Sequence, residues 1–213
     1  MRITVIFDNE VRRKGLTAGW GFSCLVEANG TSRILFDTGA SGPILLHNMR
    51  RLGLDPSAIE VVFISHDHLD HTGGLPYILE ANRDATIYVP ASFSGSIPGR
   101  KVIRVGEPVR ICDKVHSTGE LKGIEQSLLL GSSLGITVVT GCSHPGVGEI
   151  MDVASRYGRV NGIVGGLHGF RDFGRLNDLS LVSPCHCTVY KSEIERLFSE
   201  RCVECGVGLV LEL

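Results

Sequence analysis

The stretch that decides the interpretation of this 213-residue chain is Ser65-His66-Asp67-His68-Leu69-Asp70-His71-Thr72-Gly73-Gly74. It places three histidines and two aspartates within six residues, directly after the apolar residues 61–64. Imidazole nitrogens and carboxylate oxygens are common ligands of first-row divalent cations. The two glycines let the backbone turn tightly beyond the cluster. We therefore predict a metal site in which His66 and His68 face one ion, while Asp70 and His71 face a second.

Two later histidines stand in similar positions. His144 follows the predicted strand 136–140 through a Gly-Cys-Ser turn, and His186 follows the short apolar run 179–182. One loop cannot complete a metal site, which needs ligands from elsewhere in the chain. We therefore predict that His144 and His186 complete the cluster.

His168 also lies just beyond an apolar strand, predicted at residues 162–164. Three roles stay open for it: ligand of the second ion, contact to the substrate, or acid–base group. Asp37 begins an Asp-Thr-Gly turn, and we expect it to form that turn or to orient a histidine rather than bind metal. Asp67 is expected to point away, because alternate residues of His-x-His face opposite sides.

Composition favours an ordinary soluble globular protein, with 43% hydrophobic and 21% charged residues. We expect one domain spanning residues 1–213. The net charge of −2 and the scattered basic residues argue against a nucleic-acid partner. Apolar runs are far shorter than the roughly 20 residues that span a bilayer, so no membrane partner is expected. A cytoplasmic enzyme acting on a small-molecule substrate is the default expectation.

Seven cysteines is an odd number in a chain too long to need disulfide staples, so reduced thiols are expected. Two alternatives stay open near the C-terminus. One is a redox pair of Cys202 and Cys205. The other is a structural zinc site, whose four thiols would be Cys185, Cys187, Cys202 and Cys205.

Hydrophobic periodicity predicts two strand-rich halves with covering helices. Strands are predicted at residues 3–7, 21–27, 33–36, 61–64, 86–89, 101–105, 109–115, 127–130, 136–140, 162–164 and 207–211. Helices are predicted at residues 41–52, 74–82, 147–157 and 191–200, and turns at Asn29-Gly30 and Thr38-Gly39. The fold class is therefore α/β: a four-layer sandwich with helices outside two facing sheets.

The motif His-x-His-x-Asp-His followed by two glycines resembles the hallmark of the metallo-β-lactamase superfamily. The wider chain is similar to its branch of dihydropterin ribofuranosylaminobenzene phosphate synthase-like proteins. The matching stretches are residues 8–9, 34–39, 41–42, 52–55, 64–75, 141–144, 165–168 and 185–188. The resemblance implies the αββα metallo-β-lactamase sandwich with a dinuclear metal site. Its ligands would be His66, His68 and His144 for the first ion, and Asp70, His71 and His186 for the second.

The chain departs from the superfamily pattern at one ligand. Most members carry an aspartate that bridges the metals after the strand of the fourth motif, whereas here Gly165-Gly166-Leu167 leads to His168. After Cys187-Thr188 the chain also has Val-Tyr where the branch tends to carry a glycine. The substrate of the branch is therefore not carried over.

The leading functional hypothesis is a metal-dependent hydrolase with one or two Zn²⁺ ions, or with Mn²⁺ or Fe²⁺. A metal lowers the pKa of bound water from about 15.7 to about 7, and the metal-bound hydroxide would attack an ester, lactone, thioester or phosphoester. Asp70 would steer this nucleophile and His168 would protonate the leaving group. The alternatives are a transferase or condensing enzyme of pterin-type (methanopterin-like) biosynthesis and a non-catalytic metal-binding protein.

Overall fold

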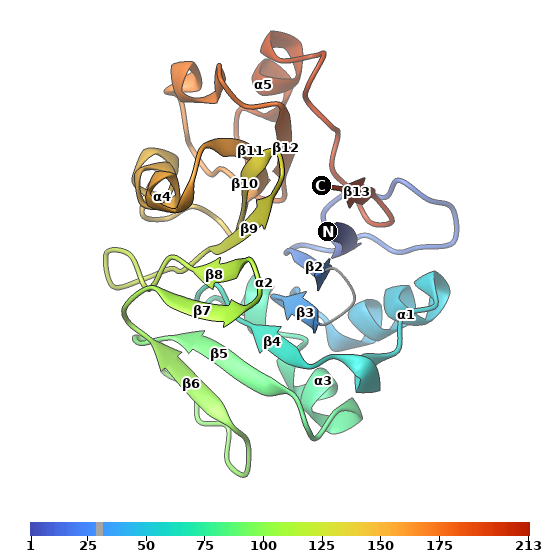
Figure 1. Cartoon of the computed structure of the whole chain (residues 1–213). Coiled ribbons are helices and arrows are strands. Elements are labelled where there is room, and N and C mark those ends of the chain that lie inside the picture. Colours follow the sequence, from blue (N-terminus) through green and yellow to red (C-terminus); the bar gives the residue numbers. More distant parts are fainter. Residues whose placement is uncertain (29–31) are drawn as a thin grey trace.

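The computed structural model describes residues 1–28 and 32–213, which form two β-sheets (Figure 1). In spatial order, the first sheet contains β13 (Val210–Glu212), β1 (Arg2–Phe7), β2 (Ser23–Ala28), β3 (Ser32–Phe36), β4 (Val61–Phe63), β5 (Thr86–Pro90) and β6 (Val102–Val105). The second contains β12 (Leu181–Cys185), β11 (Val160–Gly166), β10 (Gly135–Thr140), β9 (Leu128–Ser132), β8 (Val115–Ser117) and β7 (Val109–Cys112).

Each sheet has a parallel part that ends at the candidate site. Strands β3, β4, β5 and β6 pair in parallel in the first sheet, and β10, β11 and β12 do so in the second. The remaining neighbours pair antiparallel. Parallel strands bring their carboxyl ends to one edge of a sheet, which is where ligands bind in open α/β sheets.

Alternating side chains of β3 show how the layers form. Ile34 and Phe36 are fully buried in a core shared with Leu128 and Val139 of the second sheet, whereas Leu35 faces the opposite way. This period of two is typical of a strand covered on both faces. The two sheets therefore face one another across a common apolar core.

Helices cover the outer face of each sheet. On the first sheet, α1 (Gly42–Leu52) and α3 (Leu75–Ala81) contribute Leu45, Met49 and Ile78 to a second apolar cluster. On the second sheet, α4 (Val147–Ala154) and α5 (Lys191–Leu197) contribute Ile150 and Ile194 to a third. The helices bury these residues because apolar side chains recur on one helical face. The predicted four-layer αββα sandwich is confirmed.

Several boundaries differ from the predictions. The single strand expected at 109–115 is wrong: β7 and β8 form an antiparallel pair, because Lys114 adopts a left-handed backbone (φ 58°) between them. The last strand is β13, whereas Val207 forms only an isolated bridge with Val11. Helix α5 ends at Leu197 rather than at 200. The turn predicted at Asn29-Gly30 lies outside the described residues.

Four short elements were not predicted as regular structure. They are strand β12, the one-turn helix α2 (Leu69–Thr72) and the 3₁₀ turns η1 (Pro56–Ala58) and η3 (Phe173–Leu176). The helix predicted at residues 147–157 is formed by α4 and by the 3₁₀ turn η2 (Ser155–Tyr157) that continues it. Within the described ranges, no helix has the length and apolar character required to cross a bilayer.

Candidate metal centre

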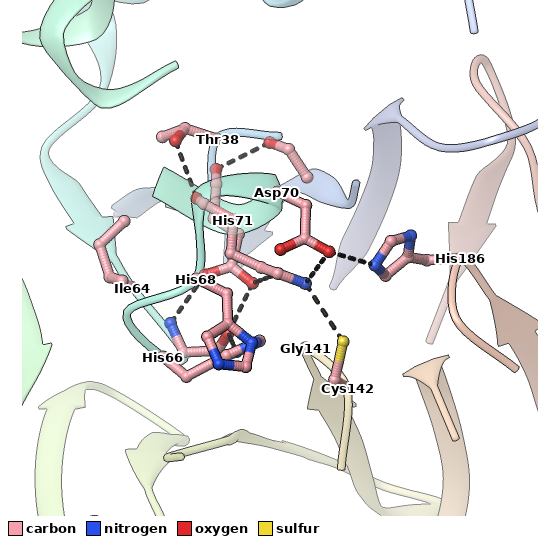
Figure 2. A network of polar contacts seen from close by, with 12 residues as sticks. Thr38, Ile64, His66, His68, Asp70, His71, Gly141, Cys142 and His186 are labelled. Atoms are coloured by element: carbon pink, nitrogen blue, oxygen red, sulfur yellow. Dashed lines mark hydrogen bonds and ion pairs between the residues drawn. The ribbon is translucent and has the colours of Figure 1, made fainter. Parts of the chain in front are cut away.

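The loop after β4 folds back on itself as the short helix α2 (Figure 2). His68 precedes this helix with an extended backbone, and its carbonyl oxygen accepts the N–H groups of His71 and Thr72, both at 3.0 Å. The turn brings donor atoms of Asp70 and His71 into one cluster with His186. Two neighbouring side chains of the motif therefore converge on a residue from the other half of the chain.

A buried carboxylate, that of Asp37, orients the loop. Its Oδ1 accepts the backbone N–H of Ser65 at 2.7 Å, and its Oδ2 accepts the Ser65 hydroxyl at 2.6 Å. The same Oδ2 lies 2.6 Å from Nδ1 of His71. A carboxylate at Nδ1 fixes a histidine so that its Nε2 points toward a metal. The predicted orienting role of Asp37 therefore matches the observed contacts.

Neutral polar side chains at Nδ1 orient His66 and His186. The Ser65 hydroxyl lies 2.9 Å from Nδ1 of His66, and the amide oxygen of Asn9 lies 3.1 Å from Nδ1 of His186.

Among the described residues, Nε2 of His66 and Nε2 of His144 are buried without any hydrogen-bond partner. Buried polar atoms without partners are rare in native proteins and call for an explanation. A divalent cation fits this set of nitrogen donors and would satisfy both atoms.

The C-terminal half supplies its side chains from strand ends with unusual backbone conformations. Ser143, His168 and His186 follow β10, β11 and β12 and have φ values of 58°, 46° and 44°. Asp37, which follows β3, has φ 52°. Positive φ is uncommon for residues other than glycine and tends to occur at functional sites. Each of these four strands thus turns sharply as it reaches the cluster.

Sequence reasoning missed Glu125, which is fully buried beneath the β10 loop. Its Oε1 accepts the N–H groups of Gly141, Cys142 and Ser143 at 3.0 Å, and its Oε2 accepts that of His144 at 2.8 Å. This carboxylate therefore fixes the backbone that carries His144. No local pattern signals this role, because the contact joins residues 15 or more positions apart.

Two sets of donor atoms lie side by side, with all atoms of a set within 4.8 Å of one another. One set is His66, Cys142 and His144, and the other is Asp70, His71, Cys142 and His186. Five of the six predicted ligands therefore belong to these sets. Cys142 was not predicted, although its place two residues before His144 in the Gly-Cys-Ser-His turn was a visible signal.

His68 and His168 lie next to these sets without belonging to them. The His68 ring is 4.6 Å from that of His66 and 4.9 Å from that of His144, between ring centres, but the residue is exposed. The His168 ring lies 5.1 Å from that of His144 and is also exposed. His68 therefore completes a triangle of rings around the first set, and His168 lies at its rim.

The local environment keeps three histidines neutral near pH 7. Burial lowers the pKa of His66 and of His144 below the ordinary value, and lowers that of His186 to about 4. A neutral imidazole keeps the lone pair that a metal requires. Burial would raise the pKa of Asp70, but His71 and His186 outweigh it and lower that pKa, so the carboxylate is ionised.

Other predicted residues lie away from the cluster. Asp67 points outward, as expected, and its Oδ2 accepts the backbone N–H of Ser94 at 2.8 Å. All seven cysteines are free, and no Cys202–Cys205 disulfide is present. Cys185 and Cys205 approach each other and Asp8, but neither Cys187 nor Cys202 joins them in a donor set. The C-terminal thiols therefore do not converge as a four-cysteine zinc site.

The sandwich fold and this histidine-rich centre agree with a comparison against protein families. Residues 17–190 match the model of the metallo-beta-lactamase superfamily, and the chain belongs to this superfamily.

Individual members of the superfamily show which proteins the chain is similar to over most of its length. The chain is 25% identical to the 7,8-dihydropterin-6-methyl-4-(beta-D-ribofuranosyl)-aminobenzene-5'-phosphate synthase of Methanocaldococcus jannaschii, over 82% of each protein. A solved metal-dependent hydrolase of the beta-lactamase superfamily is 28% identical, with a TM-score of 0.80 over 100% of this chain and 99% of that one. Zn²⁺-bound PqqB of Methylobacterium extorquens shares the fold at 12% identity, with a TM-score of 0.67 over 100% of both chains. The predicted resemblance to the synthase-like branch is confirmed.

Proposed function

We propose that this protein is a hydrolase that depends on one or two divalent cations, with Zn²⁺ as the leading candidate and Mn²⁺ or Fe²⁺ as alternatives. The observation that carries the proposal is the pair of adjacent donor sets, in which buried Nε2 atoms of His66 and His144 lack any described protein partner. A superfamily containing metal-dependent hydrolases supports it. The ligands would be His66, His68 and His144 for one ion, and Asp70, His71 and His186 for the other.

A bound ion would supply a nucleophile at neutral pH by lowering the pKa of water to about 7 and would polarise the bond under attack. The chain itself supplies orientation and proton transfer. The ionised Asp70 carboxylate, 3.0 Å from Nε2 of His186, would align the attacking water. The exposed His168 beside His144 would donate a proton to the leaving group. The substrate would be a small molecule with an ester, lactone or phosphoester bond.

Metal content comes first in testing this proposal. Protein purified without chelators or added metal should contain about two ions of zinc, manganese or iron per chain by elemental mass spectrometry. The loaded protein should then hydrolyse members of a panel of lactones, carboxylic esters and phosphoesters. Metal without hydrolysis of any panel member would favour the alternatives, and the absence of metal would contradict the proposal.

A His168→Asn variant separates its acid–base role from metal binding. We expect the metal content to be unchanged and the rate to fall by about 100-fold or more, the lower end of the typical contribution of a general acid. Loss of an ion from this variant would instead make His168 a ligand. His47→Asn is the matched control, because that side chain contacts the carbonyl oxygen of Gly15 rather than the cluster.

The similarity to the synthase of Methanocaldococcus jannaschii favours a second candidate, a transferase of pterin-type biosynthesis. In that case His168 and Asp70 would act on a condensation rather than on water. The metal-loaded protein would be incubated with a phosphorylated ribosyl-arylamine and an activated pterin, and the products separated by liquid chromatography with mass detection. Formation of the coupled product, without hydrolysis of the ester panel, would favour this candidate.

A further inference from the structure

We propose that the thiolate of Cys142 is a metal ligand shared by the two ions. This inference rests on the metal centre of the proposed function and adds to it the group that joins the two donor sets. Cys142 is the one residue common to both sets. Its Sγ lies within 4.8 Å of the donor nitrogens of His66 and His144, and also of the donor atoms of the second set.

The position of the sulfur fits coordination. Sγ of Cys142 lies 3.3 Å from Nε2 of His71, and Figure 2 shows it pointing at that ring from the β10 loop. Zinc bonds of about 2.3 Å to sulfur and about 2.0–2.1 Å to nitrogen, at tetrahedral angles, place two such ligands about 3.5 Å apart. The observed separation is therefore close to that of two ligands on one ion.

The surrounding backbone holds this thiol in place. The N–H of Cys142 donates to the buried carboxylate of Glu125 at 3.0 Å, together with the N–H groups of its neighbours. The residue itself is 3% exposed. Its loop also lies against the motif of the other half, because a Cβ on Gly141 would come 2.3 Å from Oγ of Ser65. Burial and anchoring leave the sulfur aimed at the cluster.

Strand β11 has no space for a competing side chain at this point. A Cβ on Gly166 would lie 2.5 Å from the carbonyl oxygen of Gly141, 2.6 Å from Sγ of Cys187 and 3.3 Å from Cα of Cys142. Backbone and sulfur thus occupy the space that a larger residue at 166 would need. No side chain at residue 166 therefore competes with Cys142, which is common to both sets.

A shared thiolate would give each ion four protein donors once His68 turns inward, and binding of the attacking water would expand the coordination to five. The first ion would have His66, His68, His144 and Cys142, and the second Asp70, His71, His186 and Cys142. On binding, the thiol loses its proton to solvent while its sulfur forms the bonds to metal. Because thiolate is a soft ligand, the site should prefer Zn²⁺ or iron to Mn²⁺ or Mg²⁺.

Cobalt substitution tests this directly, with a readout that does not depend on activity. Full-length protein would be stripped with a chelator, reduced and titrated with Co²⁺. We expect a thiolate-to-cobalt charge-transfer band in the near ultraviolet that saturates with the bound metal. Cys142→Ser should lose this band and bind Zn²⁺ at least about 100-fold more weakly, at or beyond the upper end of what loss of a supporting residue costs.

Cys187→Ser is the matched control, because Cys187 lies beside Cys142, with its Sγ 3.9 Å from the Cys142 carbonyl oxygen, yet belongs to neither donor set. It should keep the band. Circular dichroism of the metal-free variants checks their folding. If Cys142→Ser does not fold, the wild-type spectrum decides, because its lack of a thiolate band would overturn the proposal. Loss of the band in Cys187→Ser but not in Cys142→Ser would also overturn it.

The two proposals fail in different ways. Hydrolysis by a wild-type protein whose cobalt form lacks a thiolate band would overturn the role of Cys142 and leave the hydrolase standing. A thiolate band that depends on Cys142, in a protein that hydrolyses nothing in the panel, would support the ligand and remove the hydrolase.

Discussion

The two halves of the chain contribute to the candidate metal centre in different ways. The N-terminal half places His66, His68, Asp70 and His71 on one loop and the short helix that follows it. The C-terminal half instead presents side chains at three neighbouring strand ends, from the loops after β10, β11 and β12, and the loop after β10 carries both Cys142 and His144. The first arrangement depends on local chain geometry. The second depends on parallel strand pairing, which aligns residues far apart in the sequence.

Each half also uses a buried carboxylate, and the two carboxylates act on different parts of the chain. Asp37 contacts the side chain of His71 as well as Ser65, whereas Glu125 accepts four consecutive backbone N–H groups that end at His144. The N-terminal carboxylate therefore orients the His71 ring, and the C-terminal one fixes the loop that carries His144. In the contiguous motif the carboxylate sets the orientation of a histidine ring. In the dispersed part of the site the carboxylate sets the position of a whole loop.

The largest expected effect tests whether the two halves contribute equally to the first ion. His66→Ala and His144→Ala should each remove that ion and lower kcat/KM by about 1,000-fold or more, corresponding to several kcal/mol of transition-state stabilisation. Elemental analysis and steady-state kinetics on the best substrate of the panel would measure this. His116→Ala is the control, since its ring packs on Tyr157 rather than on the cluster. Full metal content in His144→Ala would show that the motif loop suffices alone.

Asp8 and His186 are in contact across the two halves, and the burial of each gives them opposite pH dependences. The pKa of His186 is lowered by burial to about 4, so its stabilising contribution is complete above pH 6.5 and is lost as the pH falls toward 4. The pKa of Asp8 is raised by burial to about 6, so its contribution is present below pH 4 and is lost as the pH rises through 6. Each amounts to at most about 3 kcal/mol, and they oppose one another.

Urea unfolding of metal-free protein between pH 4 and 6.5 separates these two contributions. Asp8→Asn keeps an acceptor for the His186 N–H, which donates to Oδ1 at 2.9 Å, and should make the unfolding free energy rise more steeply with pH. His186→Asn removes the contribution that rises with pH and leaves that of Asp8, so its unfolding free energy should fall as the pH rises from 4 to 6.5. Identical pH profiles in wild type and both variants would contradict the assigned shifts.

Removing the charge of Glu125 or of Asp37 tests whether the two buried carboxylates have different roles. In Glu125→Gln one acceptor oxygen becomes an NH₂ group facing backbone N–H donors, so the metal-free protein should lose about 2 kcal/mol of unfolding free energy. Asp37→Asn should mainly weaken metal binding through His71, by about 10- to 100-fold. Urea unfolding and metal titration of both variants distinguish the two effects. A stability loss confined to Asp37→Asn would reverse the assignment.

The smallest effect is expected at Asp67, which lies within the motif but points away from it. Asp67→Ala removes the hydrogen bonds from Ser94 and should cost about 0.5–1 kcal/mol, with no change in bound metal. Elemental analysis and thermal unfolding would measure both quantities. Loss of an ion from Asp67→Ala would show that Asp67 contributes to metal binding although its side chain points away from the cluster.

Most of the fold was predictable because it depends on local periodicity. The buried run before the motif and the amphipathic pattern of α1 identify a strand and a helix without tertiary information. The segment 109–115, which was predicted as a single strand, shows where prediction from periodicity fails. A single left-handed residue, Lys114, separates β7 from β8 there, and lysine carries no strong turn signal.

The identities of residues 65–74 were enough to predict the histidine-rich loop, because consecutive residues cannot separate in space and their chemistry is visible in their identities. Tertiary structure alone decided that Cys142 lies between the two donor sets and that Glu125 anchors its loop. It also decided that Asp8 and Asn9 support His186 from 178 and 177 residues away. These contacts arise when two sheets pack around a common core, which brings distant strand ends to one edge. Local sequence patterns do not predict that these distant residues lie close together.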